Sequence, residues 1–357
     1  MFIYVNDPEA IPTGSGTCDA ADLALLDGAR LYSQGESNSG GVAARLSGSI
    51  RFFYYHYLYC GSFTRLGVLV RNPCAGAGCP TVEIRKQHWA HPQLVNDGVT
   101  DTRGQRASAA VLREFFDSPE VPSDSSGTLW VRLAPGERAF LEYVDLTAPA
   151  DFAVQMGQFY ASGPISFHLI TWNPGAHGDY LPDDFYTSFP AYVALGAGGT
   201  RRGLLPHSVR SVTINIDVGE GVRGIRLGNA SSCALPDEFE AGYDWTSGTS
   251  WSRLDGNFHI EYQLTLRFNN SGPARTARMV LGPGASVTPS GCPGVPSFTY
   301  TARLGGDISR SGSGIAYGSF WSFPTTMTVP SGTTDILVTT THQGGDCAPT
   351  ELWFIPE

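Results

Sequence analysis

The sequence predicts an all-β protein built from two related antiparallel β-sandwich domains in tandem, and three observations lead to this fold class. Gly (43) and Pro (24) are abundant while charged residues make up only 16% of the 357 residues, a composition typical of short strands joined by turns. Helical periodicity is scarce, with short candidates at residues 19–26 and 107–116. Elsewhere apolar and polar residues alternate in runs separated by Gly, Pro, Asn and Ser, at the spacing of a β-sandwich.

The expected strands follow one another along the whole chain. Successive side chains of a strand point to opposite faces, so a period of two indicates a strand with one buried face. The first expected strand is MFIYV at residues 1–5, and an aromatic strand, RFFYYHYLY, lies at 51–59. The later strands lie at residues 129–133, 138–146, 165–172, 209–218, 258–268, 277–281, 334–340 and 351–355.

Three kinds of segment recur in the same order in both halves of the chain. Each half has a strand that ends at an Asn turn, then two strands joined by a Pro/Gly turn, then an aromatic strand. Such a repeated order indicates an internal structural repeat. The matching segments are LGVLVRNP (66–73) with LTLRFNNS (264–271), VRLAPGERAFLEYV (131–144) with MTVPSGTTDILVTT (327–340), and SFHLITW (166–172) with ELWFI (351–355).

The repeat sets the expected domain boundaries. We expect an N-terminal extension at residues 1–39, a first sandwich at 40–175 and a second at 206–357. Residues 176–205 are rich in Gly and Pro and are expected to form a connector on the surface of both sandwiches.

The aromatic strand carries rings on both of its faces. Phe52, Tyr54 and His56 share one face, and the other face carries Phe53, Tyr55 and Tyr57. We therefore expect both faces to be covered, one by the sandwich core and the other by the N-terminal segment, the connector or another chain. A carbohydrate-binding platform is the alternative interpretation of the same rings.

Two segments carry a resemblance to a known family. The pattern GSIRFFYYHY…RLGVLVRNP (48–73) followed by GNFHIEYQLTLRFNN (256–270) resembles a family of secreted cyanobacterial proteins known as a domain of unknown function. The second segment matches at Gly256, Asn257, Phe258, Tyr262, Leu264, Leu266, Asn269 and Asn270. The resemblance implies an exported cell-envelope protein and implies no catalytic residues. The many cysteines of this chain depart from the family pattern.

Charge and hydropathy limit the classes of partner. The net charge of −10 argues against nucleic acid, because no basic stripe is present to neutralise phosphates. No apolar stretch is long enough to span a membrane as a helix. The segment MFIYVNDP has neither the basic nor the long apolar region of a signal peptide, so we expect the exported form to be a processed chain.

The seven cysteines lie in surroundings rich in Gly, Pro and Ser. CAGAGC is the only close pair and has no CxxC partner elsewhere, so disulfides in an oxidising compartment are favoured over a metal site. We predict a Cys74–Cys79 bridge, and Cys292 with Cys347 as the bridge of the second sandwich. The odd number leaves at least one thiol free or paired between chains.

Motifs for chemistry are weak. His88 and His91 have HxxH spacing, but Pro92 indicates a loop and no HExxH helix is present. The stretch around Asp97 is rich in oxygen ligands but lacks the pattern of an EF-hand. The paired acids of LPDDF and LPDEF fit helix starts better than a glycosidase, and GxSxG is absent. We therefore predict no catalytic residue, no metal and no cofactor.

Two sets of residues are candidate sites. Four tryptophans in polar, Gly/Ser-rich surroundings are candidate glycan contacts: Trp89, Trp245, Trp251 and Trp321. Candidate assembly contacts are Phe2, Tyr4, Phe53, Tyr55 and Tyr57. The sequence thus favours a non-enzymatic structural or assembly protein of the cell surface, whose partner is itself or another envelope protein. A carbohydrate-binding protein of the same fold, with a polysaccharide as its partner, is the alternative.

Overall fold

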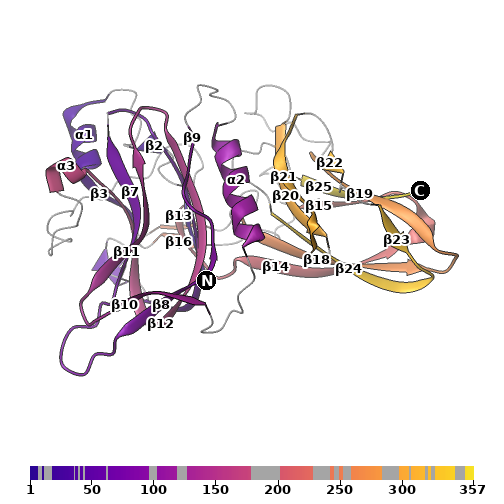
Figure 1. The fold of residues 1–357 in the computed structure, drawn as a ribbon, viewed down its shortest axis with the longest axis horizontal. Helices are drawn as coiled ribbons and strands as arrows, with labels where there is room; N and C mark the ends of the chain where they lie inside the picture. Colours follow the sequence, from indigo (N-terminus) through magenta and orange to yellow (C-terminus); the bar gives the residue numbers. More distant parts are fainter. Residues whose placement is uncertain are drawn as a thin grey trace. The chain divides into compact units, whose positions relative to one another are not determined.

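The protein is all-β, as the sequence predicts (Figure 1). The structure, a computed structural model, describes residues 1–6, 10–11, 18–35, 37–38, 41–42, 45–61, 63–95, 103–118, 127–177, 202–227, 242–244, 249–251, 259–283, 297–304, 307–317, 321–322, 326–341 and 350–357. Within these ranges the α-helices are α1 (Ala20–Asp27), α2 (Arg103–Asp117) and α3 (Pro174–His177). None of the described helices is long and apolar enough to cross a membrane.

The chain divides into two compact units. The first comprises residues 1–107, 114–206 and 241–251, and the second comprises 108–113, 207–240 and 252–357. The N-terminal residues, expected as a separate extension, belong to the first unit because their strands pair within its sheets. The division between residues 206 and 207 lies beside the expected start of the second sandwich.

The first unit contains the strands up to β13, together with β16 and β17. They are β1 (Phe2–Val5), β2 (Ala10–Ile11), β3 (Gly28–Gln34), β4 (Ser37–Asn38), β5 (Gly41–Val42), β6 (Leu46–Leu58), β7 (Thr64–Arg71), β8 (Val82–Trp89), β9 (Gln93–Val95), β10 (Thr128–Leu133), β11 (Arg138–Leu146), β12 (Phe152–Trp172), β13 (Arg202–Leu205), β16 (Gly242–Asp244) and β17 (Thr249–Trp251).

One long strand, β12, belongs to both layers of the first unit. Its first part, up to Ala161, pairs with β6 and β8, and its last part, from Ser166, pairs with β7. The register with β6 shifts between Ala161 and Ile165, where the sequence is Ser-Gly-Pro. Gly and Pro inside a strand mark a bend or bulge, which redirects β12 from one layer to the other.

The core of the first unit lies between these layers. Residues of β6 and β8, such as Phe52 and Ile84, belong to one buried cluster with Val68 of β7 and Leu169 of β12. This cluster accounts for one face of the aromatic strand.

The strand β1 lies beside the aromatic strand in the same sheet, so it extends the second face and does not cover it. This strand lies between β6, to which it is parallel, and β13, to which it is antiparallel. The ring of Tyr4 stacks on that of Phe53 with centroids 5.6 Å apart. Tyr4 therefore continues the row of rings on the second face. The guanidinium of Arg51, on that face, lies 5.1 Å from the ring centroid of Phe115, so α2 packs over it, an element that was not among the expected covers.

The expected assembly contacts are corrected by this packing. Phe2, Tyr4 and Phe53 are each at most 1% exposed, so burial in the chain's own sheet leaves their rings without a surface to offer another subunit. Tyr55 is buried too, with its ring edge-on to Phe152. Tyr57 is partly exposed and packs on the same phenylalanine, at 4.9 Å between centroids.

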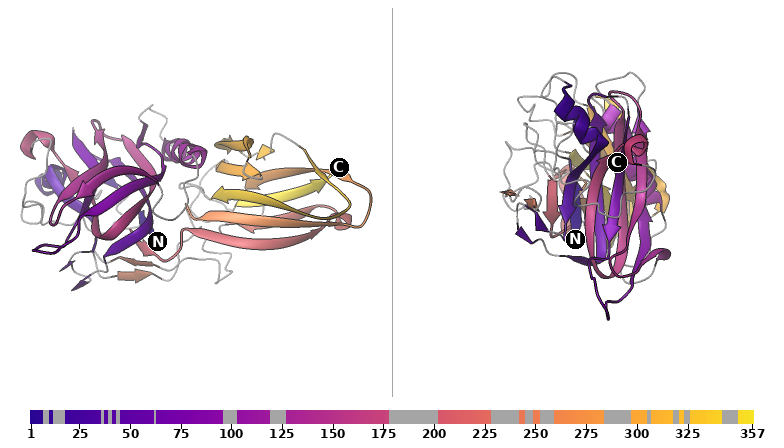
Figure 2. Two further views of the ribbon diagram at one scale, coloured as in Figure 1. Left: turned by 60° about the horizontal axis from the view of Figure 1, so that its bottom comes forward. Right: turned by 90° about the vertical axis from the view of Figure 1, so that its left-hand side faces the viewer.

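The second unit is a sandwich of two five-stranded sheets (Figure 2). One sheet has the order β14 (Val209–Asp217), β18 (Glu261–Asn270), β24 (Gly332–Thr341), β20 (Ser297–Leu304) and β21 (Asp307–Tyr317). The other contains β15 (Arg223–Leu227), β25 (Thr350–Pro356), β19 (Arg275–Pro283), β22 (Trp321–Ser322) and β23 (Met327–Val329). The core lies between the sheets, where the rings of Phe268 and Phe354 are 4.7 Å apart.

Most strand pairs are antiparallel, as expected, but β1–β6, β2–β6 and β14–β18 are parallel among the described strands. A two-residue hairpin can join only antiparallel strands, whereas parallel neighbours need a long connection. The chain from Asp217 to Glu261 provides such a connection between β14 and β18.

The two units share a pairing pattern. β7 pairs with β11 and β8 with β10 in the first unit, as β18 pairs with β24 and β19 with β23 in the second. β25 pairs with β19 and β15, as the first part of β12 pairs with β8 and β6. ELWFI therefore corresponds in pairing to the first part of β12 rather than to SFHLITW, which corrects that part of the expected repeat. The correction arises because β12 is long enough to enter both layers.

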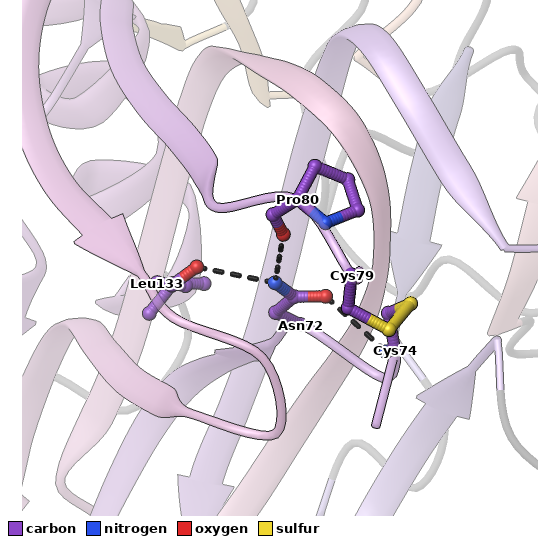
Figure 3. The surroundings of a disulfide bond; sticks show 5 residues. All are labelled: Asn72, Cys74, Cys79, Pro80 and Leu133. Atoms are coloured by element: carbon purple, nitrogen blue, oxygen red, sulfur yellow. Dashed lines mark hydrogen bonds between the residues drawn. A yellow bond between two sulfur atoms is a disulfide. The ribbon is translucent and has the colours of Figure 1, made fainter. Parts of the chain in front are cut away.

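An asparagine closes the same turn in each unit, and Figure 3 shows the one in the first unit. Asn72 follows β7, its Oδ1 accepts from the backbone N–H of Cys74, and its Nδ2 donates to the carbonyl of Leu133 at 3.1 Å. Asn270 ends β18, its Oδ1 accepts from Gly272, and its Nδ2 donates to Val329, also at 3.1 Å. Both asparagines are buried, so each amide satisfies backbone groups that are shut off from water.

Two disulfides lie in the first unit. One joins Cys74 to Cys79, the pair that the sequence predicts, beside Asn72 (Figure 3). The other joins Cys18, before α1, to Cys60, after β6, a pairing that the sequence left open. The remaining cysteines, including the expected pair, lie outside the described residues: Cys233, Cys292 and Cys347.

Candidate functional site

The only lysine of the chain lies between two tryptophans of the first unit. The Nζ of Lys86 is 4.0 Å from the ring centroid of Trp130 and 5.0 Å from that of Trp89, distances of cation–π contacts. A register shift in β10 between Leu129 and Val131 marks a bulge at Trp130. The two indoles meet edge to face, with centroids 4.4 Å apart.

This packing leaves the indole ring of Trp89 inaccessible to a ligand. The indole of Trp89 is 9% exposed, belongs to the core cluster and donates from Nε1 to Glu142 at 2.7 Å. A sugar stacks on an open ring face, and Trp89 has none to present. We therefore assign Trp89 to the core, which corrects its place among the glycan contacts.

Several polar side chains surround Glu142, which lies beside the Trp89 side chain. His91 lies 3.5 Å from Glu142 and 4.0 Å from Glu114, which is on α2. The hydroxyl of Tyr54 is buried nearby, and burial, with a further effect of the Glu142 charge, raises the pKa of this tyrosine well above its ordinary value. Within the described residues no three His, Cys, Asp or Glu side chains gather as metal ligands would.

The two histidines of QHWAHP have separate surroundings. His88 forms a hydrogen bond between its Nδ1 and the Oγ of Ser118 at 3.1 Å, and its ring packs against Phe115 of α2. His91 faces the carboxylates of Glu142 and Glu114 instead. Their side chains therefore do not converge on one point.

A serine–histidine pair is buried in the first unit. The Oγ of Ser33 on β3 and the Nδ1 of His168 on β12 are 2.8 Å apart, and neither residue is exposed. Burial, and then the positive charges of Arg30 and Arg71, lower the pKa of His168 to about 3. A general base works best with a pKa near the operating pH, and a nucleophile must be reached by substrate. The pair is therefore part of the core rather than a catalytic dyad.

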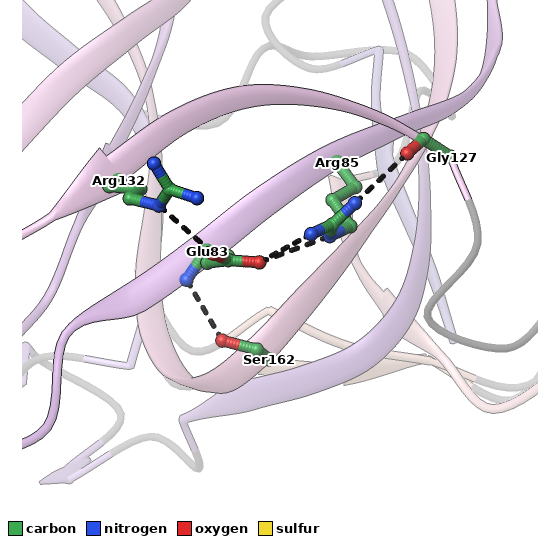
Figure 4. A network of polar contacts seen from close by, with 5 residues as sticks. All are labelled: Glu83, Arg85, Gly127, Arg132 and Ser162. Carbon is green, nitrogen blue, oxygen red and sulfur yellow. Dashed lines mark hydrogen bonds and ion pairs between the residues drawn. The ribbon is translucent and has the colours of Figure 1, made fainter.

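A charged network covers part of β8 (Figure 4). Glu83 accepts hydrogen bonds from Arg85 at 2.7 Å and from Arg132 at 2.9 Å, and its backbone N–H donates to Ser162. The two guanidinium groups hold the pKa of Glu83 below its ordinary value. Exposed ion pairs of this kind contribute little to stability, so the network reads as a solvated surface.

The open edge of β14 is the candidate functional site. Among the described strands β14 is the terminal one of its sheet, and it pairs with β18 in an unbroken register over nine residues. Its core-facing residues include Val212, which is nevertheless 48% exposed. A core-facing side chain with that exposure shows that the far side of the strand is uncovered there.

The direction of the β14 backbone follows from one hydrogen bond. Glu261 donates its N–H to the carbonyl of Ser208, so Ser208 faces β18. Both backbone groups of one strand residue point to the same side, and the side alternates along the strand. The residues that point away from β18, toward the open edge, are therefore Val209, Ser211, Thr213, Asn215 and Asp217.

The solvent-facing side of β14 is polar and uncharged over its central part. Ser211 donates from Oγ to Gln263 of β18 at 3.3 Å. One strand further in, Arg267 of β18 and Asp335 of β24 form a two-point ion pair, with distances of 2.9 and 2.7 Å. The charge of Arg267 is thus matched by its neighbour, and the edge itself carries hydroxyl and amide groups.

The other sequence-predicted residues are placed as follows. Trp251 lies in β17 and Trp321 in β22, and the structure describes their backbone only. Trp245 and Asp97 lie outside the described residues. The sequence predicted β14 as a strand but missed its role as an edge, because the neighbours of a strand come from distant parts of the chain. Its one signal was the run VRSVTINID, which contains neither Pro nor Lys.

Comparisons with known proteins place the chain in no family. No family model matches the sequence, and no curated protein matches it. Among solved structures, the CUB1-EGF-CUB2 domains of rat MASP-1 share 10% identity, with 91% of this chain and 96% of that chain covered and a TM-score of 0.20. The CBM22-1-CBM22-2 tandem domain from Paenibacillus barcinonensis Xyn10C shares 8% identity, with coverage of 94% and 99% and a TM-score of 0.17. Scores this low carry no argument about structure or function.

Proposed function

We propose that this protein is a non-enzymatic structural protein of the cell surface that assembles with a partner through the open edge of β14. The observation that carries the proposal is the 48% exposure of Val212 on a nine-residue strand that ends its sheet among the described strands. An edge strand presents a row of unpaired backbone donors and acceptors, which another extended segment satisfies by adding a strand.

The compartment is supported by the disulfides. Cys18–Cys60 and Cys74–Cys79 are both formed in the first unit. Disulfides persist in oxidising compartments and are rare in the cytosol. The resemblance of residues 48–73 and 256–270 to secreted envelope proteins agrees with an exported protein.

The non-enzymatic part of the proposal rests on the accessibility of reactive groups. The serine and histidine of the Ser33–His168 pair are fully buried. The indole of Trp89 donates to Glu142, and its ring lies 5.0 Å from the Nζ of Lys86. The Ser33–His168 pair therefore offers no reactive atom to a substrate.

The proposal is tested on the protein isolated from its source cells. We expect surface labelling to reach it and light scattering to give a mass above that of one chain, 38.2 kDa. In the source cells the native protein is replaced by the Thr213→Pro variant. The substitution removes one N–H that points to the open edge and leaves the hydrogen bonds with β18 in place, so we expect the variant to lose the assembly. Thr213→Ala keeps the N–H and is the matched control.

Two results would contradict the proposal. One is a native protein found in the cytosol with its cysteines reduced. The other is an assembly of unchanged mass that contains the folded Thr213→Pro variant, since the edge of β14 would then take no part in it.

A further inference from the structure

We propose that the partner at the β14 edge is a second copy of this chain, paired antiparallel with β14 about a two-fold axis at Thr213. This inference rests on the proposed function and names its partner. The two five-stranded sheets would then join edge to edge through an isologous contact, in which each copy uses the same residues.

The backbone groups fit this register. An antiparallel ladder alternates hydrogen-bonded pairs, in which both residues point their N–H and C=O toward each other, with non-hydrogen-bonded pairs. A two-fold axis at Thr213 sets Thr213 opposite itself, Ser211 opposite Asn215, and Val209 opposite Asp217. All of these residues point toward the open edge, as derived from the hydrogen bond between Ser208 and Glu261. Every outward donor and acceptor of the strand therefore gains a partner.

The core-facing side chains fit the same register. Val212 lies opposite the second copy's Ile214, and the reciprocal pair is formed by symmetry. Val212 is 48% exposed and Ile214 only partly buried, so the pairing extends the apolar face of the sheet over both side chains. Cross-strand contacts between β-branched residues stabilise an antiparallel pair.

The charged residues do not oppose the pairing. Arg210 and Asp217 are the charged residues of β14. In this register no like charges face each other: Arg210, on the core-facing side with Val212 and Ile214, lies opposite Ile216, and Asp217 lies opposite Val209. The solvent-facing row sets hydroxyl against hydroxyl at Thr213 and hydroxyl against amide at Ser211.

β14 also lacks most of the features by which edge strands avoid pairing with another strand. Edge strands are commonly blocked by proline, by lysine or by a bulge that twists the edge away. The strand VRSVTINID runs over nine residues without a proline, and its register with β18 has no shift; its one charge on the core-facing side is Arg210. By contrast, the edge strand β10 of the first unit has a register shift at Trp130.

The inference is tested by disulfide trapping in the full chain. Two residues that form a hydrogen-bonded antiparallel pair have Cα atoms about 5.5 Å apart, within the range of about 4.4–6.8 Å that a disulfide spans. We expect Thr213→Cys to form a covalent homodimer, with a 213–213 cross-link identified by mass spectrometry after proteolysis. Thr265→Cys, on the same face but one strand further in, is the matched control and should form no more dimer than the wild type.

A second measurement guards against adventitious cross-linking. We expect light scattering to show a concentration-dependent dimer for the wild type and for Thr213→Ala, with a dissociation constant at least tenfold weaker for Thr213→Pro. Circular dichroism checks that the Thr213→Pro variant is folded. A wild type that stays monomeric at high concentration and a Thr213→Cys variant without the 213–213 link would overturn the homodimer.

Comparing the dimer in solution with the native assembly of the Thr213→Pro variant separates this inference from the proposed function. If the homodimer is absent and the native assembly is still lost in Thr213→Pro, the edge binds a different envelope protein and only the present inference fails. If the native assembly survives in Thr213→Pro, the proposed function fails as well.

Discussion

At the scale of single residues, the two turn asparagines show how one side chain fixes a fold. Each sits at the end of a strand, folds back on the backbone two residues later and reaches a carbonyl of the neighbouring hairpin. A buried carbonyl without a donor costs about 1–3 kcal/mol. The amide is therefore needed as donor and as acceptor at once.

We expect Asn270→Asp to lower the free energy of unfolding by about 1–3 kcal/mol, because a carboxylate cannot donate to the carbonyls of Val329, Pro273 and Pro330. Urea unfolding at neutral pH measures the loss. The control is Asn269→Asp on the adjacent exposed residue, which should change stability by less than about 0.5 kcal/mol. Equal effects of the two substitutions would contradict the role assigned to Asn270.

The buried His168 should make the folded protein less stable in acid. Its pKa is lowered to about 3 in the folded protein, while that of an unfolded-chain histidine is near 6.5. Between these values the unfolded chain binds a proton that the folded protein does not, so stability falls as the pH falls from about 6.5 toward 3, with a limiting slope of about 1.4 kcal/mol per pH unit. Above pH 6.5 this residue contributes no pH dependence.

The measurement compares the wild type with His168→Gln by urea unfolding at pH 7, 6, 5 and 4. We expect His168→Gln to be the less stable protein at pH 7, because it disturbs the contact with Ser33, and the difference to shrink as the pH falls. Two stability curves that stay parallel over this range would show that His168 is not held neutral.

At the scale of elements, β1 is a short strand with a large packing role. All of its residues are buried, and it pairs on both sides. Removing the ring of Tyr4 would empty the space above Phe53. A cavity in a well-packed core costs more than the transfer of the lost atoms alone.

We therefore expect Tyr4→Ala to destabilise the first unit by about 3–5 kcal/mol. Tyr4→Phe keeps the ring and should cost less than about 1.5 kcal/mol, the contribution of the hydroxyl. Chemical denaturation followed by near-ultraviolet circular dichroism measures both. A Tyr4→Ala variant as stable as Tyr4→Phe would mean that β1 is dispensable for the sheet.

At the scale of the whole molecule, the two units have separate cores. The cluster that contains Phe52 and Phe167 lies in the first unit, and the cluster that contains Phe268 and Phe354 lies in the second. Units with separate cores open separately, so a core substitution should weaken only its own unit.

Hydrogen exchange can test this separation. We expect Phe354→Ala to speed amide exchange in β18 and β19 by at least a hundredfold, as follows from a loss of about 3–5 kcal/mol, and to leave β6 and β7 unchanged. Phe167→Ala should give the reverse pattern. An equal rise in both units after either substitution would show one cooperative core.

The sequence predicted what depends on local pattern. Alternation located β14 and β18, and the spacing of Cys74 and Cys79 indicated their bridge. It could not predict that β12 enters both layers, because the bend at Ser-Gly-Pro also reads as a turn between strands. Nor could it pair Ser33 with His168, which are 135 residues apart, or show that β14 ends its sheet. These features depend on which distant segments meet.

The shared pairing pattern also bears on how the two units arose in evolution. Two units that repeat the same ladders and the same asparagine turn are what duplication of an ancestral half-length gene produces. They differ beside the strand that carries this turn, where the last part of β12 runs antiparallel to β7 but β14 runs parallel to β18. The shared ladders therefore do not extend to this position, and each unit closes the side of its turn-bearing strand with a segment of its own.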